Sequence, residues 1–381
     1  MTKEWNSGTI EDLCEVEYGT RVVRKNDAGT KYPVYGGGGA TFSMDISNRE
    51  DRMVIARFAI SEKCTRFVKG KFFLNDSGLT ISPKNDNVFD INYLNYHILS
   101  LNDEIYSLAR GTAQKNLNVD AFKKVELSYP LSLEKQKQIV AKLDKAFSAI
   151  DTAKLNIEKN LENAKELFQS KLNEVFTQKS EGWVEKKLGE VCSLIKRGIA
   201  PKYVEMRGIQ VINQKCIRNH KIDLSLARRH NIDLKSVHPE KMIRMGDVLV
   251  NSTGVGTLGR VAQVREVVLN NITVDTHVTI VRPITGEFFN DFFGYALIKI
   301  EDEITSSGEG ASGQTELART KLENNFKLCY PTSLGIQEQI VRVLDNLNEQ
   351  TRSLESKYKQ ELNSLEELKK SILEKAFNGE L

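Results

Sequence analysis

The feature that most constrains this chain is a long segment that occurs twice. Residues 129–144 read YPLSLEKQKQIVAKLD and residues 330–345 read YPTSLGIQEQIVRVLD, so 10 of 16 positions are identical without a gap. The same offset of 201 residues continues through Leu161/Leu362, Leu172/Leu373 and Phe176/Phe377. A match of this length indicates a duplication, and it predicts a pseudo-twofold internal repeat. A duplicated scaffold with a purely structural role is the alternative.

Each copy of the segment predicts one long helix. Apolar residues recur in steps of three and four after Ser132 and after Ser333, and each serine is placed to cap a helix. No Pro or Gly occurs from residue 131 to residue 181, which predicts an amphipathic helix of about 43 residues, or ~65 Å. Two apolar stripes of matching length predict an antiparallel coiled coil, with the remaining regions at opposite ends of a rod.

The two remaining regions carry strand and turn patterns. Strands are predicted at residues 53–57 and 79–82 in the first region and at 247–250, 259–264 and 277–282 in the second, with a glycine turn at 36–39. Short helices are expected near 91–108 and 288–304. The fold class is therefore α+β: two α/β domains separated by two long helices. The expected boundaries are 1–128, 129–179, 180–328 and 329–381, and the second α/β region is about 23 residues longer in its middle.

One motif resembles a cofactor site. Gly254-Val-Gly256-Thr-Leu-Gly259 matches the glycine pattern of dinucleotide-binding folds, but that site needs a helix directly after the glycines. The residues that follow, Arg260–Val264, are β-branched and alternating. We therefore predict a glycine-rich hairpin, with a Rossmann site as the alternative.

Other chemical signatures are missing from the sequence. The five cysteines are scattered without a CxxC pair and the five histidines lack a metal-binding spacing, so no disulfide framework or metal site is predicted. There is no Walker lysine, no GxSxG and no Asn-Pro-Pro-Tyr tetrad. No apolar run approaches a membrane span. These patterns favour a non-catalytic protein of the cytoplasm, and an enzyme without a familiar motif is one alternative.

The charge distribution favours a nucleic-acid partner. The net charge is only +3, but residues 183–265 hold 16 Lys+Arg against 7 Asp+Glu. Cations interleaved with Asn, Gln and Ser suit phosphate contacts and base-edge readout of double-stranded DNA. A solvated basic face is the alternative for any single residue. The candidate DNA-binding residues are Arg24, Lys25, Arg57, Lys63, Lys69, Lys71, Arg110, Gln114, Lys115, Lys196, Arg197, Asn213, Arg218, Asn251, Arg260, Ser312 and Gln314.

The order of these parts resembles a known family. A variable region, a long helix that begins Tyr-Pro-x-Ser-Leu-x-x-Gln-x-Gln-Ile-Val, a second variable region and a matching helix are similar to the DNA-specificity subunit of type I restriction-modification systems. The glycine loops 111–117 and 310–317 and the segment 246–249 also resemble it. The first region departs from the second because Arg57-Phe-Ala-Ile60 lacks the glycine-rich hairpin of residues 251–259.

The resemblance implies a function. Each variable region would be a target recognition domain for one half of a split DNA site, and the helices would set the unread gap. Two methylation subunits would dock on the helices and two restriction subunits would join them. S-adenosylmethionine, ATP and magnesium would be bound by those partners, with no cofactor in this chain. A structural coiled-coil protein is the remaining alternative. The expected docking residues are Gln138, Ile139, Val140, Gln339, Ile340 and Val341.

Overall fold

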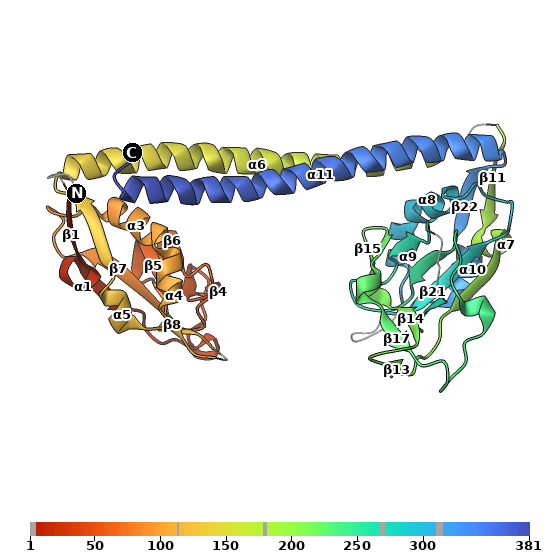
Figure 1. Cartoon of the computed structure of the whole chain (residues 1–381), viewed down its shortest axis with the longest axis horizontal. Coiled ribbons are helices and arrows are strands. Elements are labelled where there is room, and N and C mark those ends of the chain that lie inside the picture. The colour runs from red at the N-terminus through yellow and green to blue at the C-terminus, as the bar shows by residue number, and fades with distance from the viewer. Residues whose placement is uncertain (1–4, 113, 178–180, 267–270, 310–314) are drawn as a thin grey trace. The chain divides into compact units, whose positions relative to one another are not determined.

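The computed structural model describes residues 5–112, 114–177, 181–266, 271–309 and 315–381. The chain forms two compact units. Unit 1 consists of Met1–Lys159 with Tyr358–Leu381, and unit 2 consists of Asn160–Lys357. Both long helices pass from one unit to the other, so each unit contains part of each helix (Figure 1).

The sheet of unit 1 is mostly antiparallel. Its described strands lie in the order β2-β7-β5-β6-β3-β4, and β3 runs parallel to β6. Their bounds are β2 Cys14–Tyr18, β3 Tyr32–Gly36, β4 Gly39–Met44, β5 Arg49–Ala56, β6 Thr65–Leu74 and β7 Gly78–Pro83. The strand predicted at 79–82 is therefore confirmed as part of β7, and the one predicted at 53–57 is confirmed as part of β5 except for Arg57, which follows the strand. The predicted glycine turn joins β3 to β4, where Gly39 has a φ of +113° that only glycine adopts readily.

Smaller elements attach this sheet to the helices. A two-stranded ribbon pairs β1, Trp5–Thr9, with β10, Glu126–Pro130, and β10 leads directly into the first long helix. The helix α3 lies between the sheet and the long helices (Figure 1). The other elements of this unit are α1 Ile10–Leu13, α2 Arg24–Asp27, α3 Ile91–Ser100, α4 Asn102–Ser107, β8 Ala109–Arg110, β9 Asn116–Leu117 and α5 Val119–Lys123.

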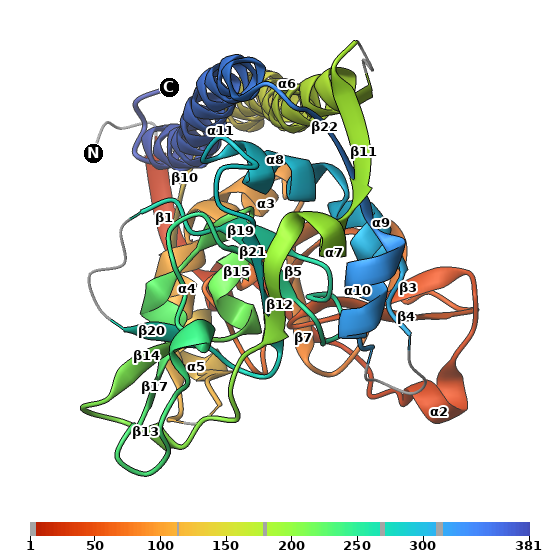
Figure 2. The same cartoon turned by 90° about the vertical axis from the view of Figure 1, so that its right-hand side faces the viewer.

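Unit 2 repeats this plan with additions. Its described strands form one sheet in the order β12-β21-β18-β19 and another in the order β13-β17-β14-β20. The ribbon β11–β22 repeats β1–β10, and α8 lies under the long helices as α3 does (Figures 1 and 2). The strands are β11 Trp183–Lys187, β12 Cys192–Arg197, β13 Tyr203–Val204, β14 Ile209–Ile212, β15 Ile217–Arg218, β16 Lys221–Ile222, β17 Arg228–His230, β18 Val248–Asn251, β19 Val261–Gln263, β20 Ile272–Val274, β21 Val278–Pro283 and β22 Lys327–Pro331. The helices are α7 Leu188–Val191, α8 Phe292–Lys299, α9 Glu301–Ser306 and α10 Arg319–Asn325, with short 3₁₀ turns at Gln214–Cys216, Leu224–Leu226 and Pro239–Lys241.

The glycine motif of unit 2 forms a hairpin. Residues 254–259 join β18 to β19, which pair antiparallel from Val248↔Gln263 to Val250↔Val261. Gly254, Gly256 and Gly259 all have positive φ. Because the segment after the glycines is a strand, the predicted hairpin is confirmed and the arrangement of a dinucleotide site is not formed.

The long helices are α6, Leu133–Thr177, and α11, Leu334–Phe377, so both predicted helices are confirmed. In unit 1 the ammonium of Lys154 lies 2.9 Å from Glu366 and that of Lys369 lies 3.6 Å from Asp151. The partner number falls as the α6 number rises, so the pair is antiparallel. In unit 2, Leu172 of α6 shares a buried core with Leu344 of α11. The part of the chain that the structure describes contains no helix long and apolar enough to cross a membrane.

A buried glutamine ties each helix start to its unit. The amide nitrogen of Gln136, which is 0% exposed, donates to Val88 O at 2.9 Å and Pro130 O at 2.8 Å, and its oxygen accepts from the Asp90 N–H at 2.8 Å. Gln337 repeats the pattern: it donates to Pro331 O at 2.8 Å and Glu287 O at 3.3 Å, and it accepts from the Phe289 N–H at 2.7 Å. The first glutamine of the repeated motif therefore has a structural role in both units.

Candidate nucleic-acid interface

In unit 1 two loops meet at one place. The hairpin β8–β9 lies against the segment that follows β5, because the Leu117 N–H donates to Arg57 O and the Ile60 N–H donates to Lys115 O, both at 2.9 Å. This junction consists of residues 57–63 with 109–112 and 114–117, and it brings together Arg57, Lys63, Arg110, Gln114 and Lys115 from the predicted set. We call it the loop junction of unit 1.

The cations of this junction are oriented by aromatic rings. The guanidinium of Arg57 lies 5.0 Å from the Tyr18 ring centroid and 4.4 Å from that of Phe58, and it donates to Asp76 O at 3.3 Å. The Lys115 ammonium lies 4.6 Å from the Tyr106 ring centroid and 3.2 Å from its hydroxyl. Lys63, Arg110 and Gln114 are exposed. A cation held over a ring keeps donors free for an acceptor at low entropic cost.

The other predicted residues of unit 1 lie on different elements. Arg24 and Lys25 are exposed on α2, and Lys69 and Lys71 are exposed on β6. Their exposure is compatible with phosphate contacts, but the structure does not gather them into the loop junction.

Unit 2 contains the same junction. The Leu317 N–H donates to Ser252 O at 2.8 Å, as Leu117 does to Arg57, and the Gly254 N–H donates to Thr315 O at 3.2 Å. The loop junction of unit 2 therefore comprises the glycine hairpin and the described residues beside Leu317. The predicted residues Ser312 and Gln314 lie outside the described residues.

Within this junction, Asn251 does not face solvent as a DNA contact would require. It is 0% exposed, and its amide nitrogen donates to Gln214 O at 3.0 Å and to Thr257 O at 3.1 Å. Asn251 therefore braces the hairpin from inside. Val255 lies at the surface of the hairpin and is 71% exposed.

Several predicted cations of unit 2 are already paired. Arg197 lies 2.5 Å from the Glu316 carboxylate and donates to Leu317 O at 2.8 Å, and Arg260 donates to Gly256 O at 2.7 Å. Lys196 pairs with Glu240. The Asn213 amide donates to Leu226 O at 3.0 Å, so it holds a turn. Arg218 is exposed beside the β15–β16 turn. Arg197 and Arg260 hold the junction in shape, whereas Arg218 is available to a ligand.

The structure adds two residues that the sequence analysis did not select. The Thr253 hydroxyl and His277 Nδ1 are 2.6 Å apart at the edge of the unit 2 junction, where His277 is exposed and Thr253 is half-buried. The buried Asp275 accepts from the His277 N–H at 2.9 Å, which fixes the turn that carries the ring. Burial raises the pKa of Asp275. Because Nδ1 takes part in this hydrogen bond, Nε2 is the ring nitrogen that remains for another hydrogen bond. In the sequence, the one feature that could have pointed to this pair is the position of His277 two residues after Asp275.

The predicted docking residues divide into two groups. Ile139, Val140 and Val341 are buried in the cores of their own units, and Ile340 is half-buried. Gln138 and Gln339 are exposed on the helix surface. Of these six residues, Gln138 and Gln339 are the two whose side chains are exposed. Among the described residues, no group of three metal-ligating side chains is found.

Solved structures of type I restriction-modification proteins resemble the whole chain in fold. A chain from a structure described as the structural basis underlying complex assembly and conformational transition of the type I R-M system matches with a TM-score of 0.76, 19% identity, and coverage of 100% of this chain and 99% of that one. The HsdS subunit from Thermoanaerobacter tengcongensis matches with a TM-score of 0.54 at 19% identity, covering 100% and 98%. At this identity the likeness is one of fold.

A family model matches most of the chain and identifies its family. The model of the type I restriction modification DNA specificity domain matches residues 2–163 and 180–364, which together include both loop junctions and most of both long helices. The two matched stretches correspond to the two copies of the internal repeat. The chain therefore belongs to the type I restriction modification DNA specificity domain family.

Proposed function

We propose that this chain is the DNA-binding specificity subunit of a type I restriction-modification complex and that it reads a bipartite site. In this proposal residues 1–128 form one recognition domain and residues 180–328 form the other. Each reads one half of the site, and the helical segments 129–179 and 329–381 set the unread gap. The family membership supports the specificity role.

One observation supports the proposal that the chain reads a bipartite DNA site. The two loop junctions share a backbone hydrogen bond, from Leu117 to Arg57 and from Leu317 to Ser252, but present different side chains. Unit 1 offers cations over aromatic rings, and unit 2 offers the Thr253–His277 pair and a braced glycine hairpin. A repeated frame with different exposed groups suits the reading of two different base sequences.

The proposed mechanism is binding without catalysis by this chain. Exposed Lys and Arg contact phosphates, and the polar side chains at the junctions contact base edges. The chemistry is supplied by partners in the cytoplasm: two methylation subunits that use S-adenosylmethionine, and two restriction subunits that use ATP and magnesium. The helices provide the docking surface, with Gln138 and Gln339 as exposed contacts.

A selection from random duplexes tests the proposal. The full chain, assembled with its methylation subunits, is incubated with a randomised duplex library, and bound sequences are recovered. Two conserved blocks separated by a gap of fixed length are expected. Alanine at Arg110, Gln114 and Lys115 should alter one block and leave the other unchanged. A single continuous block, or no enrichment, contradicts the bipartite reading.

A further inference from the structure

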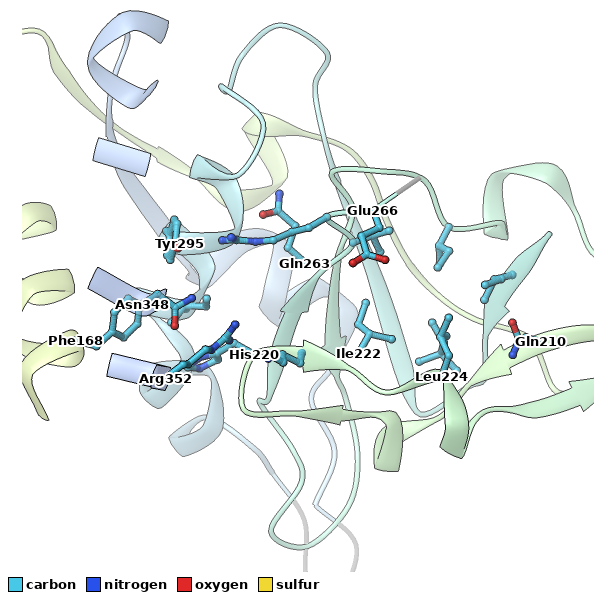
Figure 3. Close-up of a pocket in the computed structure, with 17 residues that line it drawn as sticks. Phe168, Gln210, His220, Ile222, Leu224, Gln263, Glu266, Tyr295, Asn348 and Arg352 are labelled. Carbon is cyan, nitrogen blue, oxygen red and sulfur yellow. The ribbon is translucent and has the colours of Figure 1, made fainter. Parts of the chain in front are cut away.

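Unit 2 contains a cavity of about 590 Å³ that does not belong to its loop junction. It lies between the long helices, α8 and the β15–β16 hairpin (Figure 3). Phe168, Tyr295, Asn348 and Arg352 stand at one end of the cavity, and Leu224 and Gln210 stand toward the other (Figure 3). A volume of this size falls within the roughly 300–1,000 Å³ of small-molecule sites.

The internal repeat shows why the cavity exists. The two units can be aligned here because the Tyr96 hydroxyl lies 2.5 Å from Asp144, and the Tyr295 hydroxyl lies 2.5 Å from Asp345. At the offset of 201 residues, Asn348 replaces Phe147, which is 6% exposed in the core of unit 1. In the same way Thr351 replaces Ile150, which is 7% exposed. Two core side chains of unit 1 are thus replaced by smaller polar ones in unit 2.

The ion pair at this position is also changed. In unit 1, Asp151 of α6 pairs with Lys369 of α11 at 3.6 Å. Their counterparts at the same offset are Arg352 and Phe168, so unit 2 keeps a cation and loses the charged partner across the helix pair. In unit 2 the charge of Arg352 is therefore not neutralised by the α6 residue at the corresponding position, which is Phe168.

The second wall of the cavity comes from residues in the longer middle of unit 2. The β15–β16 turn has Asn219 and His220 at φ values of 52° and 57°, as in a tight hairpin. Its His220 ring reaches Glu301 at 3.2 Å, which anchors the hairpin beside the helices. In the described strand pairs of unit 1 this hairpin has no counterpart. The first wall therefore differs from unit 1 at Asn348 and Arg352, and the second is a hairpin that the described strand pairs of unit 1 lack.

Arg352 gives the cavity its chemical preference. Its side chain is half-buried and has no hydrogen-bond or ion-pair partner among the described residues. Burial is the main cause that lowers the pKa of this guanidinium, and the neighbouring Arg265 also lowers it, whereas Tyr295 and Glu355 act in the opposite direction. Arg265 itself is neutralised by Asp345 at 2.8 Å. Glu355 acts on Arg352 through charge alone, without a hydrogen bond between them. A half-buried guanidinium whose donors have no partner is stabilised by an anion that accepts hydrogen bonds from it.

We infer that this cavity binds one organic anion per chain, with its anionic head at Arg352 and Asn348 and its apolar body along Ile222, Ile243 and Ile272. The head is a carboxylate or a phosphate, and either one accepts hydrogen bonds from a guanidinium and an amide. At this cavity Asn348 and Arg352 stand where unit 1 has Phe147 and Asp151, so a surface that two identical methylation subunits recognise alike in both units would not include it. The inference therefore goes beyond the proposed function.

Titration of the full chain with the fluorescent anion anilinonaphthalene sulfonate tests the inference. One saturable site per chain is expected. Arg352→Gln should weaken it about tenfold or more, since a hydrogen bond to a charged group is lost. Asn348→Phe should abolish it by restoring the side chain of unit 1. Arg342→Gln, on the same helix but 77% exposed in its side chain, is the matched control and should bind as the unaltered chain does.

Competition identifies the head group. Hexanoate and hexyl phosphate should displace the probe, and the stronger competitor names the head, whereas hexylamine has the same apolar body and should not displace it. Circular dichroism and DNA binding of each variant confirm that it folds. Equal probe affinity in the unaltered chain and in both cavity variants overturns the inference, as does displacement by hexylamine as strong as by hexanoate.

Discussion

Replacement of the buried glutamine at a helix start should destabilise one unit and spare the other. Gln136→Leu removes three hydrogen bonds and leaves Val88 O, Pro130 O and the Asp90 N–H without that partner in a fully buried place. Each unsatisfied buried group costs about 1–3 kcal/mol, and the leucine recovers part through its apolar surface. We expect unit 1 to lose about 3–5 kcal/mol. Gln337→Leu should do the same to unit 2.

The chain provides a separate reporter for each unit. It has two tryptophans, and Trp5 pairs with Pro130 in unit 1 as Trp183 pairs with Pro331 in unit 2. Trp183→Phe therefore leaves fluorescence from unit 1 only, and Trp5→Phe leaves it from unit 2 only. With a urea dependence of about 2 kcal/mol/M, Gln136→Leu should lower the midpoint of unit 1 by about 1.5–2.5 M.

Gln138→Leu is the matched control for this prediction. Gln138 stands two residues further along α6 and is exposed, so its replacement should change stability by about 0.5 kcal/mol or less. If Gln136 recurs only to bind a partner, Gln136→Leu would leave the midpoint unchanged. That result would refute the structural role of the repeated glutamine.

Three further outcomes are expected. Insertion of one heptad after Lys159 and another after Lys357 lengthens both helices by about 10.5 Å, so methylome mapping should show a gap wider by about three base pairs of about 3.4 Å each; an unchanged gap refutes the spacer role. Burial lowers the pKa of His97 to about 3 from 6.5. The unfolded chain therefore binds a proton that the folded chain does not, and unit 1 should lose about 1.6 kcal/mol as pH falls from 6.5 to 5. His97→Phe should remove that loss, and a persistent loss shows that another group causes it. Glutamine at Arg110 and Lys115 should reduce the salt slope of DNA binding by about 0.9 for each phosphate contact removed, and an unchanged slope in filter binding excludes the contacts.

The long helices and the hairpin were predictable because local patterns determine them. Apolar residues at helical spacing and the absence of Pro and Gly predict a helix of about 43 residues, and α6, Leu133–Thr177, has 45. The strand after Gly259 follows from alternating β-branched residues. Two equal apolar stripes predict that the helices pair, and the antiparallel direction follows because the chain must return along the second helix.

The site residues were less predictable because burial depends on distant partners. Asn251 has the type of side chain that contacts DNA bases, but its amide donates to the backbone oxygens of Gln214 and Thr257 inside the unit. Thr253 and His277 meet across 24 residues, a contact that no periodicity indicates. The parallel pairing of β3 with β6 and the order of the strands are non-local in the same way.

Methylome sequencing of one host with and without this gene, in the presence of its methylation subunits, tests the central claim most directly. The account predicts a modified motif that appears only with the gene and consists of two specific blocks separated by a fixed unread gap. Exchange of residues 180–328 for those of a relative should replace one block and leave the other block and the gap unchanged. Modification at a continuous motif, or an identical motif with and without the gene, would contradict the account.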